Sequence, residues 1–171
     1  CEGQDAARQR QVPVRLYLPD APRPGQPVPL VVFSHGIGGS RRGYSYLGRH
    51  FASNGVASLH LQHVGSDREL WFGNPLSLVG RLQSAAQDSE ALDRAKDVRV
   101  ALDLILDGPW ADRIDAQRIM AAGHSYGANT TLLASGARVP RAGNVDLRDE
   151  RLRAAIVISA PPFYGEGDPQ R

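Results

Sequence analysis

The sequence contains a single cysteine and no long apolar run. With only Cys1 available, no disulfide can form within the 171 residues. No stretch approaches the roughly 20 apolar residues of a membrane-spanning helix, so no transmembrane span is expected. The 20 Lys and Arg residues are scattered among 18 Asp and Glu residues, which gives a net charge of +2 without a basic run. This pattern indicates a solvated surface and argues against nucleic-acid binding.

An initiating methionine is also absent, because the chain begins at Cys1. A cysteine in first position suggests a processed or excised chain. Cys1 is then either the boundary of an excised piece or the lipid-bearing first residue of a bacterial lipoprotein whose signal peptide has been removed. The second alternative predicts a lipid anchor at Cys1 and an extracytoplasmic location, which we favour slightly over a cytoplasmic one.

The composition is that of one globular domain, with 42% hydrophobic and 22% charged residues. Single-domain α/β proteins often run to about 200–250 residues, so we expect the domain to be incomplete at its C-terminal end. Residues 1–11 are polar and lack an apolar period, which predicts a flexible N-terminal tail. The folded domain is then expected over residues 12–171.

A Gly-x-Ser-x-Gly motif at Gly123, Ser125 and Gly127 dominates the chain. An apolar run stops at this motif and restarts as a helical pattern, which is typical of the strand, sharp turn and helix of a nucleophile elbow. We expect Ser125 at the tip in a strained conformation, with glycines on both sides because a β-carbon there would collide with the neighbouring strand or helix.

A second motif lies upstream, where the apolar run Leu30–Phe33 ends in the glycine-rich turn of residues 34–40. In an architecture with a nucleophile elbow, such a turn supplies one half of the oxyanion hole. Its backbone N–H pairs with that of the residue after the nucleophile.

Apolar periodicity predicts the elements around these motifs. Strands are expected at residues 12–18 (an edge strand), 30–33, 56–61 and 154–159, and a further strand leads directly into the elbow. Helices are expected at 44–54 and 89–106. Their order predicts an α/β fold with a mostly parallel sheet flanked by helices. Residues 65–87 show no clean period; Trp71 and Phe72 there are interpreted either as part of a lid or acyl-pocket wall, or as ordinary loop packing.

The chain resembles the α/β-hydrolase superfamily, and within it the platelet-activating factor acetylhydrolase-like and predicted dienelactone hydrolase families. Three segments carry the similarity: Phe33–Asp67, Gly123–Thr130 and Asp146–Pro162. The resemblance implies a serine carboxyl-ester hydrolase without cofactor or metal, acting on a small-molecule ester, with dienelactones and polyesters as alternative substrates. It also implies that Ser125 attacks the ester carbonyl while the N–H groups of Ile37 and Tyr126 hold the oxyanion.

The base that such a serine needs is missing from the sequence. In this fold the acid and then the histidine follow the nucleophile, but His35, His50, His60, His63 and His124 all precede Ser125. Three explanations stay open: acid and histidine lie beyond residue 171, which we favour; the domain only binds; or an upstream histidine serves, His35 being nearest. We interpret His35 instead as holding the glycine-rich turn through backbone hydrogen bonds. His60 and His63 lack the acidic neighbours of a metal site.

The acid is equally open. The resemblance to animal acetylhydrolases places it at Ser159, which cannot serve, so an acid beyond residue 171 is favoured. Glu166 and Asp168 are alternatives, whereas Asp149 and Glu150 are expected to face solvent.

Overall fold

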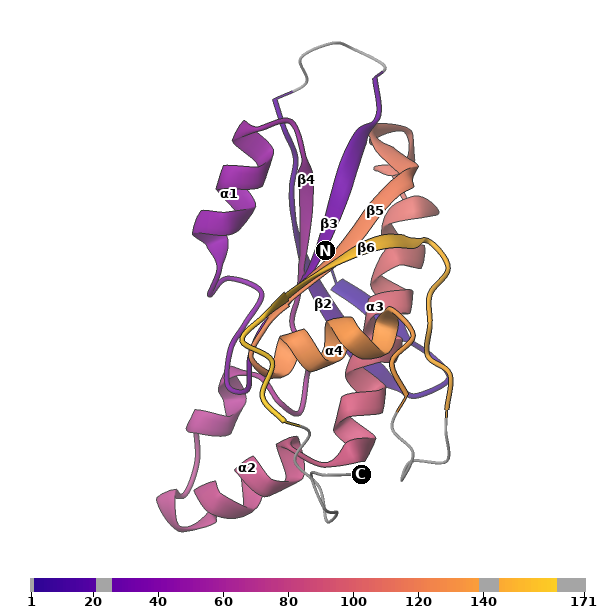
Figure 1. Cartoon of the computed structure of the whole chain (residues 1–171). Helices are drawn as coiled ribbons and strands as arrows, with labels where there is room; N and C mark the ends of the chain where they lie inside the picture. The colour runs from indigo at the N-terminus through magenta and orange to yellow at the C-terminus, as the bar shows by residue number, and fades with distance from the viewer. Residues whose placement is uncertain (1, 21–25, 139–144, 163–171) are drawn as a thin grey trace.

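The chain folds around one six-stranded mixed sheet flanked by helices (Figure 1). The computed structural model describes residues 2–20, 26–138 and 145–162. The strands are β1 (Glu2–Asp5), β2 (Arg10–Tyr17), β3 (Val28–Ser34), β4 (Ala57–Leu61), β5 (Ile114–His124) and β6 (Leu152–Ile158). The helices are α1 (Ser45–Ser53), α2 (Leu78–Ala85), α3 (Asp88–Leu106) and α4 (Tyr126–Ala134), with 3-10 turns η1 (Arg68–Trp71), η2 (Pro75–Ser77) and η3 (Ala111–Arg113).

The strand order is β1-β2-β4-β3-β5-β6. β3 runs parallel to β4 and β5, and β5 runs parallel to β6, whereas β2 is antiparallel to both β1 and β4. The predicted mostly parallel sheet is therefore confirmed. Because parallel strands end at one edge of the sheet, this topology brings the segments after β3 and β5 together.

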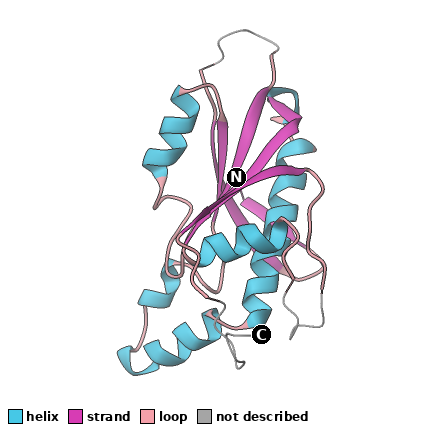
Figure 2. Cartoon of the chain, in the orientation of Figure 1, coloured by secondary structure: helices cyan, strands magenta, loops and turns pink. Residues whose placement is uncertain are grey.

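β3 is apolar from Val28 to Phe33 because helices cover both of its faces, as Figures 1 and 2 show. Leu30 and Val32 belong to the core that packs against α3, while Val31 and Phe33 pack against residues of α1 on the other face. A parallel strand buried on both sides needs apolar residues at consecutive positions. This burial fixes the strand that leads into the glycine-rich turn.

The N-terminal segment differs from the predicted tail. Its described residues form a hairpin in which β1 pairs with the first half of β2, and β4 pairs with the second half, from Val14 to Tyr17. β2 is therefore not an edge strand along its whole length. Cys1 lies outside the described residues.

Buried ion pairs explain why the hairpin is ordered although its sequence is polar. Arg8 and Arg10 reach Asp97 of α3 at 2.8 Å and 3.0 Å, and Arg10 also pairs with Glu90 at 3.1 Å. Asp97 is fully buried. Although burial opposes it, the charge of Asp97 raises the pKa of Arg10 above its ordinary value. These partners are distant in sequence, so no local pattern reveals them.

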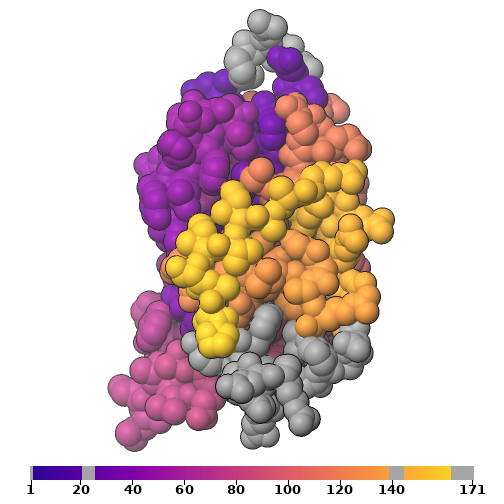
Figure 3. Space-filling model, in the orientation of Figure 1, coloured from indigo at the N-terminus to yellow at the C-terminus, as the bar shows by residue number. Residues whose placement is uncertain are grey.

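Two further regions of the fold are the stretch 65–87 and the strand β6. The stretch 65–87 contains η1, η2 and α2, where the sequence shows no helical period. β6 forms one edge of the described sheet and crosses the face shown in Figure 3 in yellow, with Ile156 and Val157 39% and 41% exposed. Across the described ranges, no helix combines the length and apolar character needed to cross a membrane.

Candidate functional site

Ser125 lies in a strained turn between β5 and α4. Its φ of 56° and ψ of −124° fall in a sparsely populated region for a residue with a side chain. The turn is tight: a β-carbon on Gly123 would collide with the Gly127 carbonyl, and one on Gly127 would collide with the Ser34 carbonyl. The Ser125 amide donates to the carbonyl of Ile158 at 2.9 Å, which ties the turn to β6. The predicted steric need for both glycines is thus met.

The glycine-rich turn packs directly against Ser125. Ser34 of β3 is in register with Gly123 of β5, so both strands end side by side. A β-carbon on Gly36 would lie 3.3 Å from the Ser125 Cβ and 3.7 Å from its Oγ. The structure therefore brings the two predicted motifs together, and a side chain at Gly36 would be tightly packed against Ser125.

The predicted oxyanion residues Ile37 and Tyr126 flank this contact. Ile37 packs against the buried cluster that contains Tyr126. Neither of their amides donates to a backbone carbonyl among the described residues. Tyr126 is the first residue of α4, where N–H groups lack partners within the helix and the dipole favours negative charge. Two uncommitted donors thus stand on either side of the contact between Gly36 and Ser125.

His35 holds the glycine-rich turn, as predicted. Its Nδ1 lies 2.6 Å from the Gly36 carbonyl, and its Nε2 accepts from the His63 amide at 3.1 Å. Because Nε2 is an acceptor, the proton resides on Nδ1 and the ring is neutral. Burial, together with the nearby Arg94, holds the pKa of His35 well below its ordinary value. The Gly36 carbonyl shares a peptide unit with the Ile37 N–H, so this bond also orients that donor.

His63 has an acidic neighbour after all, which corrects the prediction. Its Nδ1 donates to Asp97 at 3.0 Å and its Nε2 accepts from the Ser34 hydroxyl at 3.0 Å. All three side chains are at most 2% exposed, so this Ser-His-Asp chain is closed to a substrate and braces the end of β3. In the described part of the chain, no group of three or more His, Cys, Asp or Glu residues could hold a metal ion.

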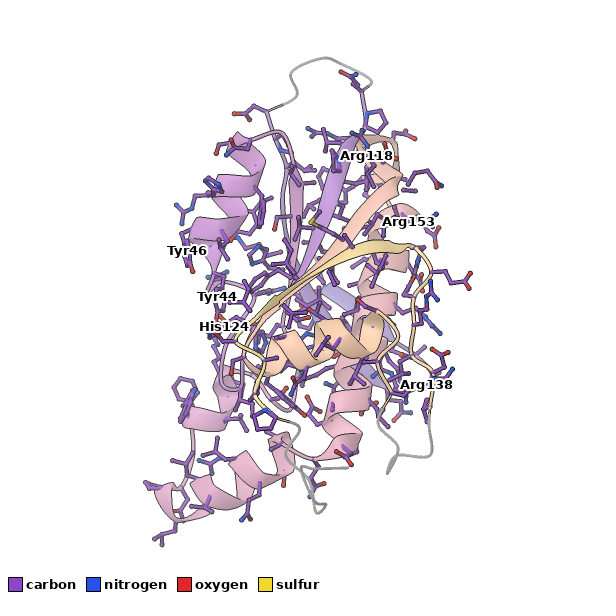
Figure 4. All side chains as sticks on the ribbon, viewed as in Figure 1. Tyr44, Tyr46, Arg118, His124, Arg138 and Arg153 are labelled. Atoms are coloured by element: carbon purple, nitrogen blue, oxygen red, sulfur yellow. The ribbon has the colours of Figure 1, made fainter. Side chains whose placement is uncertain are left out.

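Two other histidines, His60 and His124, are also hydrogen-bonded elsewhere. The Nδ1 of His124 lies 2.7 Å from the Tyr44 hydroxyl, and Figure 4 shows the two side chains together. His60 Nε2 lies 2.8 Å from the Ser58 hydroxyl, and burial lowers the pKa of His60 to about 4. Within the described residues, no hydrogen bond joins an imidazole to the Ser125 hydroxyl.

The acid candidates fare differently from the predictions. Asp149 is only 6% exposed, which corrects its predicted position in solvent; Glu150 is exposed. The Arg151 guanidinium contacts Asp149 at 2.7 Å and, against the effect of burial, lowers the pKa of Asp149. Ser159 follows β6 with a φ of 51°. Glu166 and Asp168 lie outside the described residues.

η1 lies next to the glycine-rich turn. The indole Nε1 of Trp71 donates to the Gly38 carbonyl at 2.9 Å, although Trp71 remains 55% exposed. Behind η1, a hollow of about 580 Å³ is lined by Val64, Gly65, Asp67, Glu69, Leu70, Ser77, Gly80, Arg81 and Ser84. Neither Ser125 nor Ile37 lines it, so this hollow by itself does not define an acyl pocket.

The buried arginine of α3 escaped the sequence analysis. Arg94 is fully buried and donates to the His35 carbonyl and to the Thr130 hydroxyl. One signal was available: Arg94 falls between Ala91 and Ala95 on the apolar face of α3, where a solvent-facing arginine does not belong.

The buried histidines predict that the protein loses stability in acid. Burial lowers the pKa of His35, His60 and His63 in the folded state. Below the unfolded-state value of about 6.5, the unfolded chain takes up protons that the folded chain does not. The contribution of these histidines to the free energy of unfolding is therefore fully present above about pH 6.5. It falls as the pH decreases, by up to about 1.4 kcal/mol per pH unit for each histidine.

Urea unfolding at pH 7 and pH 5 measures this effect. In His60→Gln, which cannot titrate, the loss between the two pH values should be about 2 kcal/mol smaller than in the wild type. Equal stability of the wild type at pH 7 and pH 5 would contradict the prediction.

The chain shows sequence similarity to acetylhydrolases. A family model described as "Platelet-activating factor acetylhydrolase, isoform II" matches residues 10–68. The platelet-activating factor acetylhydrolase of Canis lupus familiaris is 28% identical over 81% of this chain and 36% of that protein. The Bos taurus protein is 26% identical over 82% of this chain and 37% of that protein. The chain thus spans little more than a third of these relatives.

Solved structures agree with this similarity. A ferulic acid esterase from Streptomyces cinnamoneus is 30% identical with a TM-score of 0.58, over 82% of this chain and 40% of that one. The alpha/beta hydrolase GrgF from Penicillium sp. sh18 is 19% identical with a TM-score of 0.64, over 94% of this chain and 45% of that one. The chain therefore has the α/β-hydrolase fold and is similar in sequence to the platelet-activating factor acetylhydrolases.

Proposed function

We propose that this chain carries the nucleophile and the oxyanion hole of a serine carboxyl-ester hydrolase. The observation that supports it most is the contact between two separate motifs: Gly36 of the upstream turn lies against Ser125 at the start of α4. The relatives that are named acetylhydrolase or esterase support the same reaction class.

In the proposed reaction, the Ser125 hydroxyl attacks the ester carbonyl and its proton passes to a histidine. The amides of Ile37 and Tyr126 donate to the oxyanion, and the N-terminal end of α4 adds its dipole. The histidine then protonates the leaving alcohol, and water hydrolyses the acyl-enzyme. Losing one such donor typically raises the barrier by about 3–4 kcal/mol.

The base and the acid are proposed to lie beyond residue 171. The described His35, His63 and His124 all make other hydrogen bonds, and the chain spans little more than a third of its acetylhydrolase relatives. We propose esters with short or medium acyl groups as substrates. Dienelactones and polyesters are alternatives within the same chemistry.

A fluorophosphonate probe tests the proposal, because it modifies only a serine that a base activates. We expect the complete protein to be labelled at one site, the Ser125 hydroxyl, as found by mass spectrometry of the digested protein. Heat-denatured protein is the control and should remain unlabelled. The alternative of a binding domain without catalysis rests on the missing contact between a described histidine and Ser125; an unlabelled native protein would favour that alternative.

A further inference from the structure

Arg94 of α3 bonds both to the upstream turn and to α4, which carry the two halves of the proposed oxyanion hole. Its side chain is fully buried, and its nearest partners are neutral groups. Burial lowers the pKa of Arg94 to about 10. Taking a guanidinium out of water without a directly bonded carboxylate costs free energy. A protein with an apolar side chain of similar volume at such a position is often at least as stable. Stability alone therefore explains this arginine poorly.

On one side, Arg94 holds the upstream turn at two points. Its Nη2 donates to the carbonyl of His35, two residues before the proposed Ile37 donor. Its Nη1 donates to the Ser66 hydroxyl at 2.9 Å, and the Ser66 carbonyl in turn accepts from the Gly38 amide at 2.9 Å. The residues on both sides of Ile37 are thus tied, directly or through one intermediate, to one guanidinium.

On the other side, Arg94 holds α4. Its Nε donates to the Thr130 hydroxyl at 2.9 Å, and its guanidinium lies over the Tyr126 ring, 4.8 Å from the ring centre. The Thr130 hydroxyl also contacts the Tyr126 carbonyl at 3.2 Å. The planar fork of an arginine can hold several acceptors at fixed angles, which a lysine cannot do.

We infer that Arg94 is a positioning residue that sets the separation between the Ile37 and Tyr126 amides. This inference rests on the proposed function. Arg94 touches neither substrate nor reacting atoms; it acts through the His35 carbonyl and through α4. An oxyanion hole works only when both donors fit the oxygen of the tetrahedral transition state. A shift of the turn relative to α4 therefore reduces the stabilisation of the transition state more than the binding of the ester.

The test compares Arg94→Met, Arg94→Lys and the control Arg99→Met in the complete protein. Arg99 lies on the exposed side of the same helix. With p-nitrophenyl butyrate, Arg94→Met should lower kcat about 100-fold and change KM less than about threefold, since the loss of oxyanion stabilisation typically costs this much. Arg94→Lys, which keeps the charge but not the fork, should lose about tenfold. Arg99→Met should match the wild type.

A trifluoromethyl ketone separates positioning from a merely structural role, because it forms a tetrahedral adduct with the nucleophile. Its inhibition constant should rise in Arg94→Met in proportion to the loss of kcat, about 100-fold. If folded Arg94→Met has the kcat and the inhibition constant of the wild type, the inference about Arg94 is overturned while the proposed function still stands. A wild type without turnover would overturn the proposed function, and the inference with it.

Thr130→Val provides the test should Arg94→Met not fold. Valine keeps the shape of threonine but removes the hydroxyl that accepts from the Arg94 Nε and donates to the Tyr126 carbonyl, so we expect a folded protein with kcat lowered about fivefold. A kcat equal to that of the wild type in this variant would overturn the inference.

Discussion

Replacing Ser125 by alanine is expected to lower kcat for p-nitrophenyl acetate or butyrate by at least about 10⁴-fold. Without the hydroxyl no acyl-enzyme forms, and only the binding of the ester and the oxyanion donors would still favour its hydrolysis by water. The fold should persist, because alanine adds no atom to the contact with Gly36 and the hydroxyl of Ser125 caps no helix end. Initial rates with the complete protein, with circular dichroism of both forms, provide the measurement.

Ser135→Ala is the matched control for this substitution. Ser135 lies at the other end of α4 and is exposed, so its loss should leave kcat and KM at the wild-type values. Turnover in Ser125→Ala equal to that of the control would remove Ser125 from the proposed role. A folded Ser125→Ala protein that also loses fluorophosphonate labelling would assign both activities to one hydroxyl.

The sequence predicts the elbow well because the Gly-x-Ser-x-Gly spacing is itself local. Gly123 is required by a collision with the Gly127 carbonyl of the same motif, whereas Gly127 is required by the Ser34 carbonyl of β3. Likewise, the run Leu30–Phe33 of β3 is apolar because it is buried on both faces, and this pattern is readable without knowing its partners. The prediction that His35 braces the glycine-rich turn also relied on residues adjacent in sequence, and its bond to the Gly36 carbonyl confirms it.

The parts that sequence analysis missed depend on contacts between distant residues. Arg8 and Arg10 meet Asp97 across 89 and 87 positions of the chain, so the N-terminal hairpin looks like a polar tail until α3 is in place. Asp149 looks solvent-exposed for the same reason, since its burial depends on packing near α4 rather than on its neighbours in sequence. The partners of polar residues are hard to predict from sequence, because the same polar pattern is compatible with an exposed surface and with a buried ion pair.

Substituting Asp97 by alanine should lower the free energy of unfolding by about 3–5 kcal/mol. The carboxylate accepts from Arg8, Arg10 and His63 at 2.8, 3.0 and 3.0 Å, and it is fully buried. Its removal leaves the guanidiniums of Arg8 and Arg10 with fewer partners. It also removes the acceptor of the His63 N–H. Urea unfolding at pH 7 measures the change. Asp103→Ala is the control on the same helix: this carboxylate is 53% exposed, so its loss should cost less than about 1 kcal/mol.

A second comparison separates an uncompensated charge from a lost contact. If the cost of Asp97→Ala comes from stranded positive charge, then Arg10→Met in the same chain should recover part of it, because an apolar side chain replaces a guanidinium that has lost its bonds to Asp97. The two changes made together should therefore cost less than the sum of the single changes. Strict additivity would show that Arg10 and Asp97 contribute independently, and it would contradict the view that this ion pair holds the N-terminal hairpin against α3.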